Sequence, residues 1–175
     1  RDIAQAFNSM FGIDFFPEPE PVIMDDAARV MSLRNGVNKM SKSDESDYSR
    51  INLTDDGDTI ALKIQKARTD PEPIPSTEGQ FEGRPEAENL VGIYAALSGT
   101  SIKEVCAEFG GKNFSEFKPR LTETAVAKLV PIGEEIRRLS QDIGYIDAVL
   151  SDGAERARNI AHPVFAEVRE IMGLI

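Results

Sequence analysis

The residues best suited to chemistry lie in one short stretch, Asn38-Lys39-Met40-Ser41-Lys42-Ser43-Asp44. Two lysines stand three positions apart, with one serine between them and a second serine directly after the second lysine. Ammonium groups, hydroxyls and free backbone N–H groups on a loop are suited to binding phosphate oxygens. Loops of this composition are also common as solvated connections, so the stretch alone leaves both interpretations open.

The elements before this stretch are a helix and an extended connection. Apolar residues recur at helical spacing from Ile3 to Phe11, and Gly12 then supplies a C-terminal stop. Three prolines between residues 16 and 22 predict an extended connection. The apolar segment from Ala28 to Leu33 is either a short strand or one helical turn, because it is too short for periodicity to decide. Residues 34–48 are predicted to form a loop.

Helices are predicted to dominate the rest of the chain. Asp55, Asp56 and Asp58 provide N-cap and first-turn acids for a helix whose apolar face holds Ile60 and Ile64. Residues 70–85 carry four prolines and two glycines and are predicted to form a loop. The later helices are marked by a stripe from Leu90 to Leu97 ending at Gly99, by a capping box at Ser101 and Glu104, and by long stripes over residues 117–139 and 146–171.

Composition restricts the class of protein. Of 175 residues, 41% are apolar and 29% are charged, which is typical of a globular chain. The net charge of −10 argues against a protein that coats nucleic acid nonspecifically, although basic residues cluster locally at 63–68 and 137–138. For any single cluster, the solvated side of a helix is the favoured interpretation. One histidine and one cysteine, Cys106, give no metal-ligand set, and Cys106 is predicted to be a core residue. We expect no membrane partner, because no apolar run approaches the roughly 20 residues of a membrane span.

Several motifs carry a resemblance to a known family. Arg29 to Leu33 followed by Lys39-Met40-Ser41-Lys42-Ser43 resembles the second signature of the class I aminoacyl-tRNA synthetases. The surrounding residues resemble bacterial-type tryptophanyl-tRNA synthetases specifically. Further matches follow in the family's order: residues 1–8, 63–70, 89–99, 153–157 and 172–174.

The chain departs from the family pattern in three places. Asn35-Gly36-Val37-Asn38 stands where the family has Asp-Pro and a basic residue, and Glu45-Ser46-Asp47-Tyr48 is more acidic and lacks proline. Both changes bear on the dynamics of the lysine loop. The family's first signature, a His-x-Gly-His-like segment, and its Gly-x-Asp-Gln segment are absent, and residue 1 is Arg. We therefore expect the chain to be the C-terminal portion of an enzyme and to be inactive alone.

The resemblance implies a mechanism and assigns residues to it. The tryptophan carboxylate attacks the α-phosphorus of ATP, which is bound with Mg²⁺ as a substrate, and pyrophosphate leaves. Lys42 and Lys39 are the implied catalytic residues, because they would stabilise the charge that develops on the leaving oxygens. The implied ATP-binding residues are Val30, Lys39, Met40, Ser41, Lys42 and Ser43. The implied partners are tRNA(Trp), ATP and tryptophan, for a cytoplasmic homodimer with no resident metal or prosthetic group.

The predicted fold is mainly α. Residues 1–50 are expected to be the tail of a Rossmann-like nucleotide-binding α/β domain that carries the lysine loop. Residues 51–86 are expected to connect it to a C-terminal helical bundle, residues 87–175, that binds the anticodon end of tRNA. Two alternatives stay open: a tyrosyl-tRNA synthetase, which the amino acid charged would reveal, and a noncatalytic tRNA-binding or helical interaction module, which the upstream coding sequence would reveal.

Overall fold

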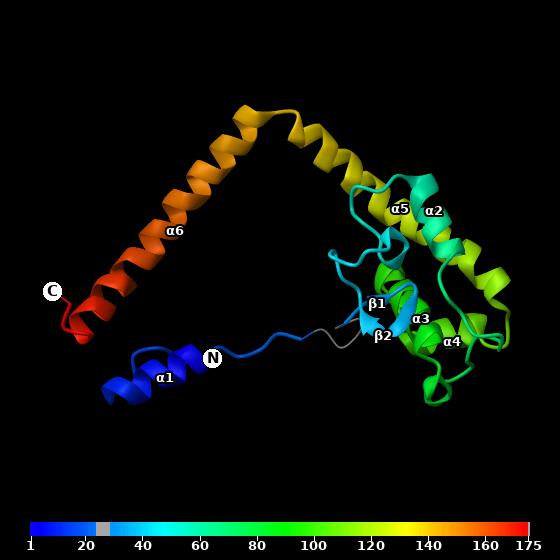
Figure 1. The fold of residues 1–175 in the computed structure, drawn as a ribbon, viewed down its shortest axis with the longest axis horizontal. Coiled ribbons are helices and arrows are strands. Elements are labelled where there is room, and N and C mark those ends of the chain that lie inside the picture. The colour runs from blue at the N-terminus through cyan, green and yellow to red at the C-terminus, as the bar shows by residue number, and fades with distance from the viewer. Residues whose placement is uncertain (24–28, 175) are drawn as a thin grey trace. The chain divides into compact units, whose positions relative to one another are not determined.

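The computed structural model of the protein describes residues 1–23 and 29–174, and it is mainly helical (Figure 1). The predicted segment from Ala28 to Leu33 begins outside the described residues, and within them Met31–Ser32 is a strand. The elements in chain order are α1 (Asp2–Phe11), β1 (Met31–Ser32), β2 (Asn35–Lys39), the 3₁₀ helix η1 (Asp47–Ser49), α2 (Gly57–Gln65), the 3₁₀ helix η2 (Glu78–Phe81), α3 (Pro85–Ser98), α4 (Ile102–Phe109), α5 (Phe114–Ser140) and α6 (Ile143–Ile171).

The chain divides into two compact units. The larger unit, Met24–Arg138, holds the β1–β2 hairpin, helices α2 to α4 and nearly all of α5. The smaller unit joins Arg1–Ile23 to Leu139–Ile175 and holds α1 and α6. All the residues singled out by the lysine-loop motif belong to the larger unit.

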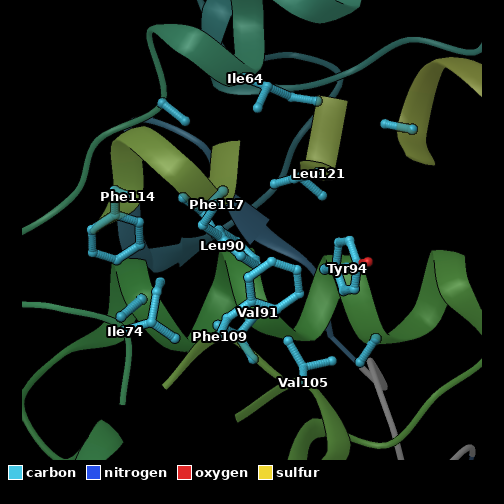
Figure 2. Close-up of a cluster of buried hydrophobic side chains, with 14 of the residues drawn as sticks. Ile64, Ile74, Leu90, Val91, Tyr94, Val105, Phe109, Phe114, Phe117 and Leu121 are labelled. Carbon is cyan, nitrogen blue, oxygen red and sulfur yellow. The ribbon is translucent and has the colours of Figure 1, made fainter. Parts of the chain in front are cut away.

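An aromatic core holds the larger unit together (Figure 2). Phe117 of α5 is completely buried, and its ring centroid lies 5.1 Å from that of Phe109 in α4 and 5.5 Å from that of Tyr94 in α3. Ring pairs at such separations add to the stabilisation that burial of apolar surface gives. Ile60 and Ile64 of α2, at most 1% exposed, belong to the same cluster, as the apolar face of the predicted helix requires.

Short-range signals place the ends of the helices. Gly12 and Gly99 adopt left-handed backbone conformations with φ of 66° and 71° and end α1 and α3. The Asp56 side chain accepts a hydrogen bond from the Thr59 N–H and begins α2. Ser101 and Glu104 form both hydrogen bonds of the predicted capping box at the start of α4. These four sequence predictions are confirmed.

In the smaller unit both predicted helices form, but the burial of α6 differs from the prediction. In α1, the Phe7 ring packs against those of Phe11 and Phe16 in tilted and edge-to-face arrangements, and the Asn8 side chain hydrogen-bonds the backbone of Phe15 and Phe16. The predicted apolar stripe of α6 was expected to pack within a helical bundle, yet none of the described residues of α6 is buried. The stripe predicted the helix correctly but not its burial, because periodicity shows which face is apolar and not what covers it.

No helix among the described residues has both the length and the apolarity needed to cross a membrane.

Candidate functional site: the lysine loop and its hairpin

An antiparallel hairpin leads into the lysine loop. Met31 of β1 pairs with Lys39 of β2, and Ser32 pairs with Asn35, with a register irregularity between the two pairs. Residues 35–39 were predicted as loop, and this prediction is wrong. Asparagine and glycine favour turns over strands, but pairing with β1 and packing on α3 hold this segment extended. Lys39 therefore ends a strand, and the loop begins after it.

The turn of the hairpin is fixed in the core. The Leu33 side chain is only 2% exposed and belongs to the core cluster. Its backbone N–H donates to the Ser49 carbonyl at 2.9 Å, and its carbonyl accepts from the Arg68 N–H at 2.7 Å. The hairpin is thus tied to the segment that follows the lysine loop and to the segment that follows α2.

Asn89 of α3 holds β1 through its side-chain amide. Its Oδ1 accepts from the Met31 N–H and its Nδ2 donates to the Met31 carbonyl, both at 2.9 Å. The Asn89 amide thus bonds the Met31 backbone as a neighbouring strand would. Asn89 itself is only 8% exposed. Sequence reasoning missed this role. The available signal was a polar residue directly before the apolar stripe that begins at Leu90.

Gly36 lets β2 approach the start of α3 closely. A Cβ at this position would lie 2.5 Å from the Pro85 carbonyl carbon and 2.6 Å from the Glu86 nitrogen, distances that real Cβ atoms essentially never show. Only glycine fits against the backbone at this separation. Pro85 is the first residue of α3, so the hairpin sits directly on the beginning of this helix.

The predicted site residues gather around the exit of the hairpin. The Met40 N–H donates to the Val30 carbonyl at 3.0 Å, and the Met40 side chain packs against the core. Lys39 and Lys42 are both exposed. Ser41 and Ser43 hydrogen-bond each other through their hydroxyls at 3.0 Å, and the Ser43 N–H donates to the Ser41 hydroxyl at 3.3 Å. Met40 therefore fixes the start of the loop, and Lys39 and Lys42 lie on either side of Met40 in the sequence.

The two loop lysines have no carboxylate partner. Within the described residues, neither the Lys39 nor the Lys42 ammonium makes an ion pair or a hydrogen bond. An exposed ammonium group without a partner is free to bind an anion. The two ammonium groups are therefore chemically able to contact phosphate oxygens.

The basic cluster after the loop behaves differently. Lys63 is 1% exposed, and its Nζ lies 2.7 Å from Asp47 and 2.6 Å from Asp55. Burial acts to lower the pKa of Lys63, but the hydrogen bonds and charges of these two carboxylates together raise it above its usual value. The hydrogen bond from Lys63, followed by one from Asn52, lowers the pKa of Asp47. Sequence reasoning favoured a solvated helix face here, which is wrong for Lys63 because the two acids compensate its burial.

Several cavities lie among the described residues of the larger unit. Val30 and Met31 line one of about 330 Å³, together with Arg29, Gly36 and residues at the start of α3. A larger groove of about 1030 Å³ runs between α2 and α5 and contains none of the predicted site residues. No group of three or more His, Cys, Asp or Glu side chains suited to a metal ion occurs in the described part of the chain.

Comparison with known proteins identifies the family. Residues 1–129 match the family model described as tRNA synthetases class I (W and Y). The chain belongs to this family. It is 56% identical over 174 residues to a tryptophan--tRNA ligase of Caulobacter vibrioides, with 99% of the chain and 51% of that protein covered. It is 54% identical over 194 residues to a tryptophan--tRNA ligase of Mesorhizobium japonicum, with 100% of the chain and 55% of that protein covered.

Solved structures agree with this assignment. The crystal structure of tryptophanyl-tRNA synthetase from Mycoplasma pneumoniae matches with a TM-score of 0.84 at 26% identity, over 99% of this class I chain and 53% of that one. The crystal structure of tryptophanyl-tRNA synthetase from Campylobacter jejuni matches with a TM-score of 0.57 at 26% identity, over 99% of this chain and 51% of that one. The chain thus spans about half the length of the curated relatives it matches.

Proposed function

We propose that the protein carrying this chain is a tryptophan--tRNA ligase, which activates tryptophan with ATP and transfers it to tRNA(Trp). The observation that carries the proposal is the identity of 56% and 54% to two proteins of that name over at least 99% of the chain. The matching family includes enzymes for tryptophan and for tyrosine. Tyrosine is therefore the alternative amino acid, and the names of the relatives favour tryptophan.

The proposed catalytic groups are Lys42 and Lys39. Negative charge develops on the leaving pyrophosphate, and a fixed cation there stabilises the transition state more than the ground state. Both lysines are exposed and lack a carboxylate partner among the described residues, which supports this role. ATP would arrive with its Mg²⁺ as a substrate.

The neighbouring residues have supporting roles in this proposal. Ser41 and Ser43 would offer hydroxyl and N–H donors to the phosphates, and the backbone of Val30 would lie against adenine. Met40 would anchor the loop, which its packing against the core supports. The loop would close over ATP and open after the reaction.

We assign a separate function to each of three consecutive segments of the chain. Residues 1–50 would complete a nucleotide-binding α/β domain, residues 51–86 would connect, and residues 87–175 would bind the anticodon end of tRNA. Unpaired RNA bases can be splayed and read by side chains. We place the enzyme in the cytoplasm, where tRNA is charged, and expect a homodimer, as is typical of the family that the motifs resemble.

Lys42→Ala in the full-length protein tests the proposed site. Tryptophan-dependent exchange of pyrophosphate into ATP should fall by about 10²-fold or more, as when a transition-state donor is lost. The KM for tryptophan should barely change. Lys128→Ala is the matched control, because Lys128 is an exposed lysine of α5 outside the proposed site.

Two outcomes would contradict the proposal. An exchange rate for Lys42→Ala within about threefold of the parent, which corresponds to less than about 0.7 kcal/mol on the barrier, would remove Lys42 from the site. Exchange that depends on tyrosine and not on tryptophan would assign the enzyme to the other branch of the family.

A further inference from the structure

The segment that leaves the lysine loop is held by one arginine. Arg50 Nη1 donates to the Asp44 carbonyl at 2.9 Å and to the Ser46 carbonyl at 3.4 Å. Its Nη2 lies 3.1 Å from an Asp47 carboxylate oxygen. Asp44 is only two residues beyond Lys42, so the guanidinium group binds the chain directly after the loop.

The arginine is itself held in place. Its side chain is 17% exposed, and its Nε donates to Asn52 Oδ1 at 3.2 Å. Asn52 Nδ2 in turn donates to Asp47 at 3.1 Å. The second Asp47 oxygen accepts from the buried Lys63 ammonium at 2.7 Å. A planar guanidinium fixed at three nitrogens has little rotational freedom left, which suits it to hold a backbone in one position.

The two ends of the lysine loop are therefore fixed by different means. At the start, the Met40 N–H donates to the Val30 carbonyl, and the Met40 side chain packs against the core. At the end, Arg50 binds the backbone of Asp44 and Ser46. Residues 41–43 lie between these points, and the hydrogen bonds that Ser41 and Ser43 make remain within residues 41–44. The reach of Lys42 thus depends on both fixed points.

This arrangement accounts for the unusual composition after the loop. Glu45-Ser46-Asp47-Tyr48 lacks the proline that the resembled family uses there, so the backbone is not stiffened covalently. Asp47 instead connects Arg50 to Lys63, and the charges of Arg50 and Lys63 balance those of Asp47 and Asp55. The acidic residue serves to fix the arginine that binds the loop.

We propose that Arg50 is a positioning residue for the activation step: by holding the backbone of Asp44 and Ser46, it sets where the Lys42 ammonium meets the phosphates of ATP. The inference rests on the proposed function of the lysine loop. Arg50 itself is bonded to the backbone and to Asp47, so it acts through Lys42 and has no contact with the reacting atoms.

The test compares Arg50→Lys and Arg50→Ala with the parent in the full-length protein. Arg50→Lys keeps the charge but cannot bind two carbonyls and a carboxylate with a fixed fork. In pyrophosphate exchange, kcat/KM for ATP should fall by about tenfold in both variants, within the roughly hundredfold loss that a misplaced reacting group causes. The KM for tryptophan should stay within about twofold of the parent, a difference too small to indicate an altered pocket.

Two further measurements separate positioning from general stability. Arg120→Ala is the matched control, because Arg120 forms one exposed ion pair with Glu123 on α5 and should leave pyrophosphate exchange, which is measured without tRNA, unchanged. Amide hydrogen exchange of residues 41–48, measured with and without ATP, should be faster in the Arg50 variants, while exchange in α3 should match the parent.

The outcomes are distinguishable. If Lys42→Ala abolishes activity while both Arg50 variants keep the parent kcat/KM for ATP and the parent amide exchange, Arg50 does not position the loop and the proposed function stands. If Lys42→Ala keeps exchange within about threefold of the parent, the proposed role of Lys42 fails, and the inference about Arg50 fails with it, whereas the proposed ligase activity is tested separately by the dependence of exchange on tryptophan. If Arg50→Ala raises the KM for tryptophan as much as that for ATP and exposes α3 to exchange, the role is only structural and the inference is wrong.

Discussion

Gly36→Ala tests whether the hairpin is seated as the structure shows. The new methyl group would lie 2.5 Å from the Pro85 carbonyl carbon, 2.7 Å from its oxygen and 2.6 Å from the Glu86 nitrogen. Carbon atoms in contact are normally about 3.5–4.0 Å apart, so the strand and the helix must separate by roughly 1 Å. All three neighbours are backbone atoms at the start of α3, and none can move aside by rotating a side chain.

The expected cost is about 2 kcal/mol of unfolding free energy, in the middle of the range for forced overpacking of a core. Gly92→Ala is the matched control. Gly92 lies within α3, and a Cβ there would meet no atom within 4 Å. Alanine favours a helix over glycine by about 0.5–1 kcal/mol, so the control should be neutral or stabilising. The two substitutions add the same methyl group, and only Gly36→Ala should destabilise the protein.

Urea unfolding of the purified chain, followed by circular dichroism, measures both changes. Gly36→Ala should lower the midpoint without altering the slope, and Gly92→Ala should leave or raise it. A Gly36→Ala protein as stable as the parent would show that β2 does not contact the start of α3 at this distance. Contact with α3 would then not position Lys39, which lies three residues further along the strand.

Three further predictions concern Asn89, Lys63 and tRNA. Asn89→Ala leaves the Met31 N–H and carbonyl without their partner and should cost about 2 kcal/mol in urea unfolding, the penalty for unpaired buried polar groups. Lys63→Met leaves Asp55 buried without its cation and should cost about 3 kcal/mol at neutral pH. Because the pKa of Lys63 is raised in the folded state, its contribution is complete below about pH 10.4, its unfolded value, and the difference between parent and variant should shrink as pH rises above that. Because the pKa of Asp47 is lowered, the difference should also shrink as pH falls below about 3.9. Binding of tRNA to the purified chain should be weak and should fall steeply between low and high salt; binding that is absent at low salt, or independent of salt, would count against anticodon recognition by residues 87–175.

The features that the sequence predicted well are local ones, such as the ends of helices. The capping box at Ser101 and the stop at Gly99 depend on residues within a few positions, and such chemistry is visible in a sequence. The burial of Cys106 followed from its place in an apolar stripe, and burial raises the pKa of its thiol as predicted for an inert core cysteine. The site motif was also visible, because Lys39 to Ser43 is contiguous.

What the sequence did not predict was the support for that motif. Asn89 binds Met31 across 58 positions, and residues 35–39 become a strand only because β1 and α3 are beside them. Lys63 looked like a surface residue because its two acids precede it by 8 and 16 positions, in different segments. Each of these outcomes depends on a distant partner, and the propensity of a single segment contains no information about such partners.

The proposed phosphate-binding loop is compatible with an acidic chain because the cations of the chain are unequally neutralised. Ion pairs with carboxylates occupy Lys63, Arg50, Arg68 and Arg84. Lys39 and Lys42 have no such partner in the described residues, and the Asp44 carboxylate next to them accepts a hydrogen bond from the Ser46 N–H at 2.8 Å. Salt screens distant surface charges beyond about 8 Å, whereas a phosphate in contact with two ammonium groups is screened far less. The pairing of charges around the loop, more than the total of −10, therefore determines whether an anion can bind there.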